Sequence, residues 1–279
     1  MESAARLGRH SQSQYDRFRI SLMSASAEKD AETIASRYWH ESTRPLTSLL
    51  FIAPMLLFYE IGVLCLGPQA IRNAADVWLR QLLDMIGLGQ YFLLPVLACG
   101  GLLAWHHTLH QPWRFSWAVL YGMLFESLVF GFLLVVIAGW QSRLMTASIP
   151  ACSANGGGAS SPLATMVAYV GAGIYEEVLF RLMLLPAAWG LMRVFGFSNR
   201  TSIVSAVIVT SLIFSAAHYQ IDLIIASHRV TTTFGEKFSL SSFIFRFLAG
   251  VAFSSLFLLR GFGVTAGSHA MYDLFTLLV

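Results

Sequence analysis

An apolar stretch with two adjacent glutamates decides how this sequence is interpreted: Ala164-Thr-Met-Val-Ala-Tyr-Val-Gly-Ala-Gly-Ile-Tyr-Glu176-Glu177-Val-Leu-Phe-Arg181-Leu-Met-Leu-Leu-Pro186. A helix of about 20 apolar residues spans the hydrocarbon core of a bilayer, and this stretch is long enough to do so. A charged side chain at the bilayer centre costs at least about 2.5–3.5 kcal/mol. The glutamate pair therefore predicts a functional site inside a membrane segment.

The composition of the whole chain also indicates a membrane protein. Of its 279 residues, 56% are hydrophobic and only 12% are charged, whereas soluble domains carry about 25% charged residues. The apolar runs are 46–66, 90–105, 116–140, 162–190, 201–218, 238–259 and 263–279. We therefore predict an all-α, polytopic transmembrane helical bundle of about seven or eight spans. Residues 75–88 alternate apolar and charged side chains, which predicts an amphipathic helix at the membrane surface.

The chain divides by composition into three regions. Residues 1–45 are polar and partly disordered in our interpretation, residues 46–160 hold the first membrane helices, and residues 161–279 form the core that carries the chemistry. The first region has no signal peptide, and Met23 is an alternative start. Its seven basic residues predict that the N-terminus lies on the cytoplasmic side. We expect the protein to be located in the cytoplasmic membrane. This basic excess concerns orientation, so we expect the lipid bilayer, and no nucleic acid, as a partner.

The two glutamates differ in their local surroundings. Glu177 and Arg181 are four residues apart, so they share a helix face in the order that favours an ion pair. A structural ion pair that joins helices is our favoured interpretation of these two. Glu176 points about 100° away and has no local partner, which suits a general base.

Three further polar residues lie in later apolar runs. His218 closes the run 201–218, and His269 and Asp273 lie four residues apart on one face of the last run. Because both histidines lie in spans near the glutamate pair, we interpret them as functional residues. Hydrogen bonding between helices is the alternative.

The remaining polar residues of the apolar runs read as structural. Either Glu60 or Glu126 is a candidate partner for Arg246, and we interpret all three as structural residues that join helices. The histidines near Trp105 are expected in a surface loop; they are His106, His107 and His110.

Three ordered motifs resemble those of the CPBP family. They are Glu176-Glu177-x-x-x-Arg181, Phe214-x-x-x-His218 and His269-x-x-x-Asp273. The family includes CAAX prenyl proteases and bacterial relatives connected with bacteriocin processing and self-immunity. The resemblance covers roughly residues 160–279, and it implies an intramembrane endopeptidase with a peptide or protein substrate at the membrane.

The resemblance also implies a role for each catalytic residue. Glu176 with His218 would activate a water, and His269 with Asp273 would stabilise the oxyanion. Prenyl proteases carry Asn where this chain has Asp273, and an ionised Asp cannot donate a hydrogen bond. Asp273 would have to be protonated, or it would hold His269 in place.

The sequence does not decide whether the site uses a metal ion, and it allows two other functions. Glu176, His218 and His269 are the candidate ligands if zinc is a cofactor, although there is no HExxH motif. A non-catalytic membrane scaffold or immunity-type protein with the same fold is the alternative function. A proton-coupled transporter is the third, but no internal repeat of the kind found in many transporters is visible.

A regular zig-zag of helices would separate the site residues in depth. It would put His218 and His269 at opposite membrane surfaces, with Glu176 near the middle. The glycines Gly261, Gly263 and Gly267 precede His269 and allow an irregular entry. We therefore expect a broken or displaced helix beside a polar cavity.

Overall fold

The computed structural model describes residues 35–70, 72–89, 92–146, 161–220, 222–225, 228–231 and 235–278. The expectations for most of the polar N-terminal region, including the alternative start at Met23, lie outside these residues. The chain separates into two compact units, Met1–Glu41 and Ser42–Val279. In the first, the described residues are helical, and Arg37 Nε lies 2.9 Å from Glu41 Oε1. The division into three regions stays a prediction.

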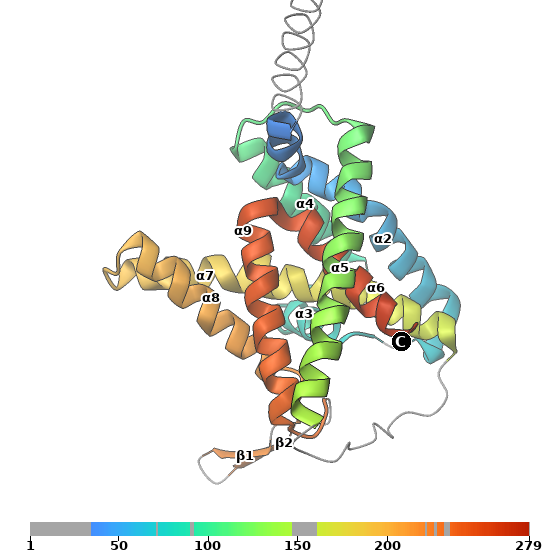
Figure 1. The fold of residues 1–279 in the computed structure, drawn as a ribbon, viewed down its shortest axis with the longest axis vertical. Helices are drawn as coiled ribbons and strands as arrows, with labels where there is room; N and C mark the ends of the chain where they lie inside the picture. Colours follow the sequence, from blue (N-terminus) through green and yellow to red (C-terminus); the bar gives the residue numbers. More distant parts are fainter. Residues whose placement is uncertain are drawn as a thin grey trace, which may run out of the picture. The chain divides into compact units, whose positions relative to one another are not determined.

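Eight α-helices make up most of the described part of the second unit (Figure 1). They are α2 (Pro45–Leu66), α3 (Ala74–Met85), α4 (Leu93–Thr108), α5 (Trp117–Thr146), α6 (Pro162–Glu177), α7 (Leu185–Val194), α8 (Asn199–Ala216) and α9 (Leu240–Thr276). A 3₁₀ turn, η1 (Gly67–Gln69), follows α2, and a π-helix, η2 (Val178–Leu184), joins α6 to α7. Strands β1 (Asp222–Ile225) and β2 (His228–Thr231) form an antiparallel hairpin, with Asp222 opposite Thr231 and Ile225 opposite His228.

Five helical segments of the described chain are long and apolar enough to cross a membrane. They are Pro45–Leu66, Trp117–Leu144, Pro162–Val194, Asn199–Ala216 and Leu240–Thr276. The predicted all-α membrane bundle is confirmed, and the predicted count of seven or eight spans is confirmed as far as five. Helix α4 has 16 residues, fewer than the roughly 20 that a span needs. The last two predicted runs belong to the single helix α9.

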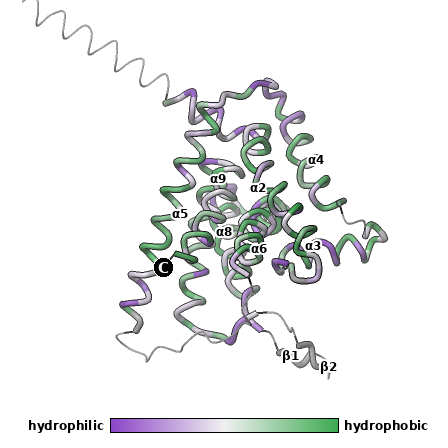
Figure 2. Tube along the Cα trace, turned by 90° about the vertical axis from the view of Figure 1, so that its right-hand side faces the viewer, coloured by the Kyte–Doolittle hydropathy of each residue, from purple (hydrophilic) through white to green (hydrophobic). Residues whose placement is uncertain are grey.

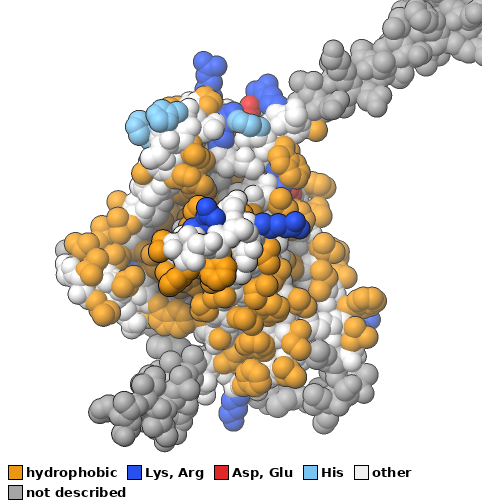
Figure 3. Space-filling view, turned by 90° about the vertical axis from the view of Figure 1, so that its left-hand side faces the viewer, with side chains coloured by type: hydrophobic (Ala, Val, Ile, Leu, Met, Phe, Trp, Pro, Cys, Tyr) orange, Lys and Arg blue, Asp and Glu red, His pale blue; other side chains and the backbone are white. Residues whose placement is uncertain are grey.

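The outer surface of the bundle is apolar. Figure 2 shows hydrophobic residues along most of α5, and Figure 3 shows hydrophobic side chains over most of one face. On α5, large side chains are turned outward: Tyr121, Phe125, Phe132 and Trp140 are all more than 60% exposed. An apolar surface of this extent requires an apolar solvent, which the bilayer supplies.

A sharp kink divides α9 into two arms, both visible in Figure 1. Gly261 has φ 78° and ψ 179°, and a Cβ there would lie 3.1 Å from the carbonyl oxygen of Thr43. Beside the kink, Arg260 makes two hydrogen bonds of 2.6 and 2.7 Å to the Glu126 carboxylate. The expected break before His269 is therefore present, and it starts at the first of the three predicted glycines.

The second arm of α9 lies tightly against α6. A Cβ on Gly173 would lie 2.6 Å from the backbone nitrogen and the Cβ of Ala270. Only a glycine allows this approach, which brings the end of α6 next to His269.

A polar network fixes α3 against α2. The fully buried Asp76 accepts hydrogen bonds from Tyr59 (2.9 Å), Arg72 (2.9 Å) and Arg80 (2.7 Å). The predicted amphipathic helix thus exists, and its first turn is anchored inside the protein by Asp76.

The expected pairing of Glu60 or Glu126 with Arg246 is wrong. Glu126 binds Arg260 at the kink, and Arg246 binds Glu236 at 2.7 Å. Glu60 instead accepts a hydrogen bond of 2.6 Å from Tyr175, the residue before the glutamate pair. The network that holds α3 therefore extends to α6.

Candidate active site

The glutamate pair stands where the α-helix changes into a π-helix. Glu177 ends α6, and η2 occupies the next seven residues, including Arg181. Pro186 follows at the start of α7, and because proline has no N–H it cannot complete an α-helical ladder there. We attribute the wide turn to this missing donor. The sequence predicted a continuous helix, and π-turns are frequent at functional sites.

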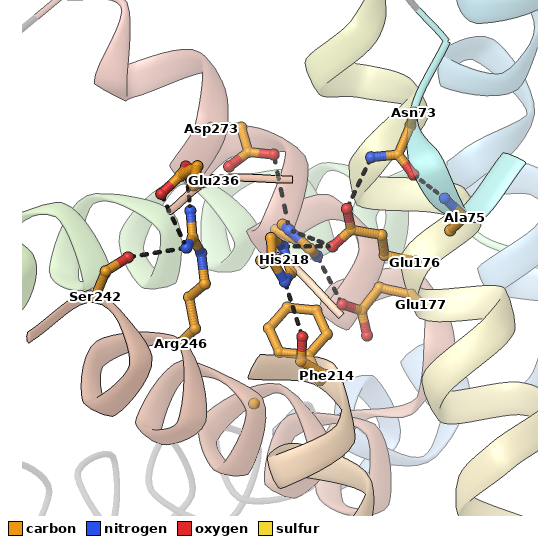
Figure 4. Close-up of polar contacts among 12 residues, drawn as sticks. Asn73, Ala75, Glu176, Glu177, Phe214, His218, Glu236, Ser242, Arg246 and Asp273 are labelled. Carbon is orange, nitrogen blue, oxygen red and sulfur yellow. Dashed lines mark hydrogen bonds and ion pairs between the residues drawn. The ribbon is translucent and has the colours of Figure 1, made fainter. Parts of the chain in front are cut away.

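Glu176 is the centre of the site (Figure 4). Its Oε1 accepts a hydrogen bond of 2.7 Å from Asn73 Nδ2. Its Oε2 lies 3.8 Å from His218 Nε2 and 3.7 Å from His269 Nε2. This Oε2 is buried and has no hydrogen-bond partner among the described side chains. The N-cap residue of α3 therefore binds one oxygen of the Glu176 carboxylate, and two histidines, one just after α8 and one on α9, face the other oxygen.

The tautomer of His218 follows from its backbone contact. Nδ1 lies 2.8 Å from the carbonyl oxygen of Phe214, and a carbonyl can only accept, so Nδ1 carries the proton. In the neutral ring, Nε2 is then a free acceptor that faces Glu176. Burial lowers the pKa of the imidazole more than the Glu176 carboxylate raises it, so His218 is neutral at pH 7.

Glu177 connects His269 to Arg181. Its Oε1 lies 2.7 Å from His269 Nδ1 and 3.0 Å from Arg181 Nη1, so the predicted contact between Glu177 and Arg181 is present. Arg181 is almost fully buried, donates a second hydrogen bond to the carbonyl oxygen of Gly250, and lies 4.5 Å from the centre of the Phe214 ring. Glu177 therefore holds His269 in place in addition to neutralising Arg181.

Asp273 lies farther from His269 than the sequence suggested. Its Oδ2 is 3.7 Å from His269 Nε2, too long for a direct hydrogen bond. The contact that orients the imidazole comes from Glu177 instead. With Glu176, Glu177 and Asp273 around it, His269 lies among three carboxylates, which favour its cationic form.

These groups line a cavity of about 670 Å³. Its lining includes Glu176, His218, His269 and Asp273. The rest of the lining mixes apolar and aromatic side chains, such as Trp78, Phe245 and Tyr272, with polar and charged ones, which are Arg72, Asn73, Glu236, Ser242, Arg246 and Thr276. The expected polar cavity beside a broken helix is therefore present in the structure.

The candidate zinc ligands do not fit a metal ion well. Across the described ranges, no group of three or more His, Cys, Asp or Glu side chains is arranged to hold one. The predicted surface loop is wrong for two of the three histidines near Trp105, because His106 and His107 belong to α4 and His106 is fully buried. Within the described ranges, these two and His110 form no metal-binding group either. A free carboxylate oxygen that faces a histidine acceptor suits the two protons of a water molecule instead.

Sequence reasoning missed Asn73. Its side chain accepts a hydrogen bond from the backbone N–H of Ala75, so it is the N-cap of α3. Asn directly before an amphipathic run is a helix-start signal, which predicts the cap. The contact with Glu176 spans 103 residues and has no local pattern.

Comparison with family models agrees with the geometry. Residues 158–275 match the family described as Type II CAAX prenyl endopeptidase Rce1-like. The chain carries a domain of this CPBP family, which is a family of membrane proteases. Comparisons with curated proteins and with solved structures found no match. All four expected catalytic residues lie within the matched range, whereas Asn73 lies before it.

Proposed function

We propose that the protein is an intramembrane endopeptidase that hydrolyses peptide bonds with a water activated by Glu176 and His218. One observation carries this proposal: Glu176 Oε2 has no hydrogen-bond partner in the described part of the chain and lies 3.7–3.8 Å from Nε2 of two histidines. Separations of this size between two polar atoms suit a bridging water. The catalytic core would be residues 161–279.

Activation of the water follows from the two acceptors. Glu176 Oε2 and His218 Nε2 each take one hydrogen bond from the same water, which leaves its lone pairs directed into the cavity. As the water oxygen attacks the carbonyl carbon, its proton passes to Glu176. The carbon–nitrogen bond then breaks, and the same proton goes to the leaving amine nitrogen.

Stabilisation of the oxyanion falls to His269. Its Nδ1–H is taken by Glu177, so only the cationic ring can donate from Nε2 to the developing negative oxygen. Removal of one such donor typically lowers kcat by about 10²–10³-fold. In this account Asp273 keeps His269 cationic by its charge and does not itself donate.

The substrate is a peptide that enters the cavity from the bilayer or its surface. The family implies a peptide substrate, and the apolar part of the cavity lining suits apolar side chains. We keep the cytoplasmic membrane, with the N-terminus inside, as the proposed location. No step is assigned to zinc.

Cleavage of a quenched-fluorescent peptide library by the detergent-purified full chain tests the function. We expect wild type and the control His107→Ala, at an exposed position of α4, to cleave the same peptides, and His218→Ala and His269→Ala to lose at least about 10²-fold in kcat. A chelator should leave the wild-type rate unchanged. Full activity in either site variant, or chelator inhibition reversed by zinc, would contradict the mechanism.

A further inference from the structure

The first turn of α3 reaches the active site from outside the matched family domain. Asn73 Nδ2 donates a hydrogen bond of 2.7 Å to Glu176 Oε1. The two residues are 103 positions apart, and the family match begins at residue 158. The contact is therefore made by the part of the chain for which the family resemblance gives no role.

The orientation of the Asn73 amide is fixed by its second contact. Its Oδ1 lies 2.8 Å from the backbone nitrogen of Ala75, which can only donate. The NH₂ group must then face Glu176, so it acts as a donor to the carboxylate. The same side chain thus caps a helix with its oxygen and binds Glu176 with its nitrogen.

The helix that carries Asn73 is anchored independently of Glu176. Asp76, one turn on, accepts hydrogen bonds from Tyr59, Arg72 and Arg80. Arg80 also lies 3.4 Å from Glu60, which accepts a hydrogen bond from Tyr175. The position of Asn73 is therefore set by a buried network of α2, α3 and α6, so Asn73 is preorganised for Glu176.

We infer that Asn73 is a positioning residue for the general base. By occupying Oε1 it makes Oε2 the atom that takes the proton of the water, and its dipole favours the ionised carboxylate. This inference rests on the proposed function of Glu176. It assigns the region before the matched domain a direct part in the active site.

Two substitutions separate this role from capping. Ser and Asp cap helices about as well as Asn, but neither offers an NH₂ donor. We expect Asn73→Ser to keep the thermal stability and KM of wild type while kcat falls by about 10-fold to 100-fold, as for a lost hydrogen bond to a charged group. Asn73→Asp places a second carboxylate beside Glu176, so the acidic limb of its kcat–pH profile should move to higher pH.

A matched control loses a cap far from the site. Ser198 caps α8 through its contact of 3.2 Å with the backbone nitrogen of Thr201. Ser198→Ala should lower thermal stability and leave kcat of the folded enzyme unchanged.

The outcomes distinguish the inference from the function on which it rests. Wild-type kcat in Asn73→Ser, or an unmoved pH profile in Asn73→Asp, would overturn the role of Asn73. The function of Glu176 would stand in that case, provided that Glu176→Gln is inactive. An active Glu176→Gln would instead remove the proposed function itself.

Discussion

Replacement of Glu177 by Met tests whether this carboxylate both neutralises the buried Arg181 and holds His269 in place. The change removes the acceptor for His269 Nδ1 at 2.7 Å and the partner of Arg181 at 3.0 Å. Arg181 is 1% exposed, so it is left as a buried charge without its carboxylate. Breaking a buried pair in this way costs about 3–5 kcal/mol, and the Phe214 ring offsets only part of it.

The cost should be visible in thermal unfolding. For a chain of this size, about 3–5 kcal/mol lowers Tm by roughly 6–20 °C. The double variant Glu177→Met/Arg181→Met replaces both charges by apolar side chains of similar length. We expect it to recover most of the stability, because an apolar pair is often as stable as a buried ion pair.

Activity should not recover with stability. In both variants His269 lacks the carboxylate that holds its ring in place, and loss of an orienting carboxylate in a comparable triad lowers kcat by about 10⁴-fold. The measurement is the rate of peptide cleavage per folded enzyme molecule in each variant. A double variant that regains both stability and activity would refute the assignment of Glu177 as the residue that holds His269. A single variant as stable as wild type would refute the buried pair.

Three further predictions follow from the site. Gly173→Ala forces a Cβ to within 2.6 Å of Ala270, so α6 and α9 must separate and kcat should fall by about 10²-fold. The control Gly190→Ala adds a Cβ in open space and should leave kcat unchanged; equal kcat values in the two variants would contradict the close approach. Asp273→Asn removes one carboxylate beside a cationic imidazole, so the basic limb of the kcat–pH profile should move to lower pH, and an unmoved limb would contradict its charge role. Because burial lowers the pKa of His218, the ring stays neutral as the pH falls to about 6.5 and accepts a proton only below it; a loss of kcat on acidification that is already complete above pH 6.5 would count against His218 as the acceptor.

The sequence predicted those features that have a local pattern. Apolar runs gave the helices, the spacing of Glu177 and Arg181 gave their contact, and glycines before His269 gave the kink at Gly261. The three ordered motifs selected residues that the structure brings together around Glu176.

Features that depend on packing could not be predicted in this way. The contact of Asn73 with Glu176 needs α3 to be anchored by Asp76, which no spacing shows. The residue that orients His269 could not be predicted either. The sequence offered Asp273 for this role, whereas Glu177 contacts Nδ1 of His269, because the π-turn and the close approach at Gly173 bring the two side chains together. The predicted pairing of Glu60 or Glu126 with Arg246 was wrong for the same reason, because the partner of a side chain in a bundle depends on which helices pack against each other.

The rate of peptide cleavage by Glu176→Gln tests the central claim most directly. The substitution keeps the size of the side chain and its contact with Asn73, but an amide cannot take the proton of a water. The full chain would be compared in detergent with wild type and with Asp84→Asn, an exposed carboxylate of α3. The account predicts an unchanged Tm and no measurable cleavage for Glu176→Gln, with wild-type rates for the control. Cleavage by Glu176→Gln at the wild-type rate would contradict it.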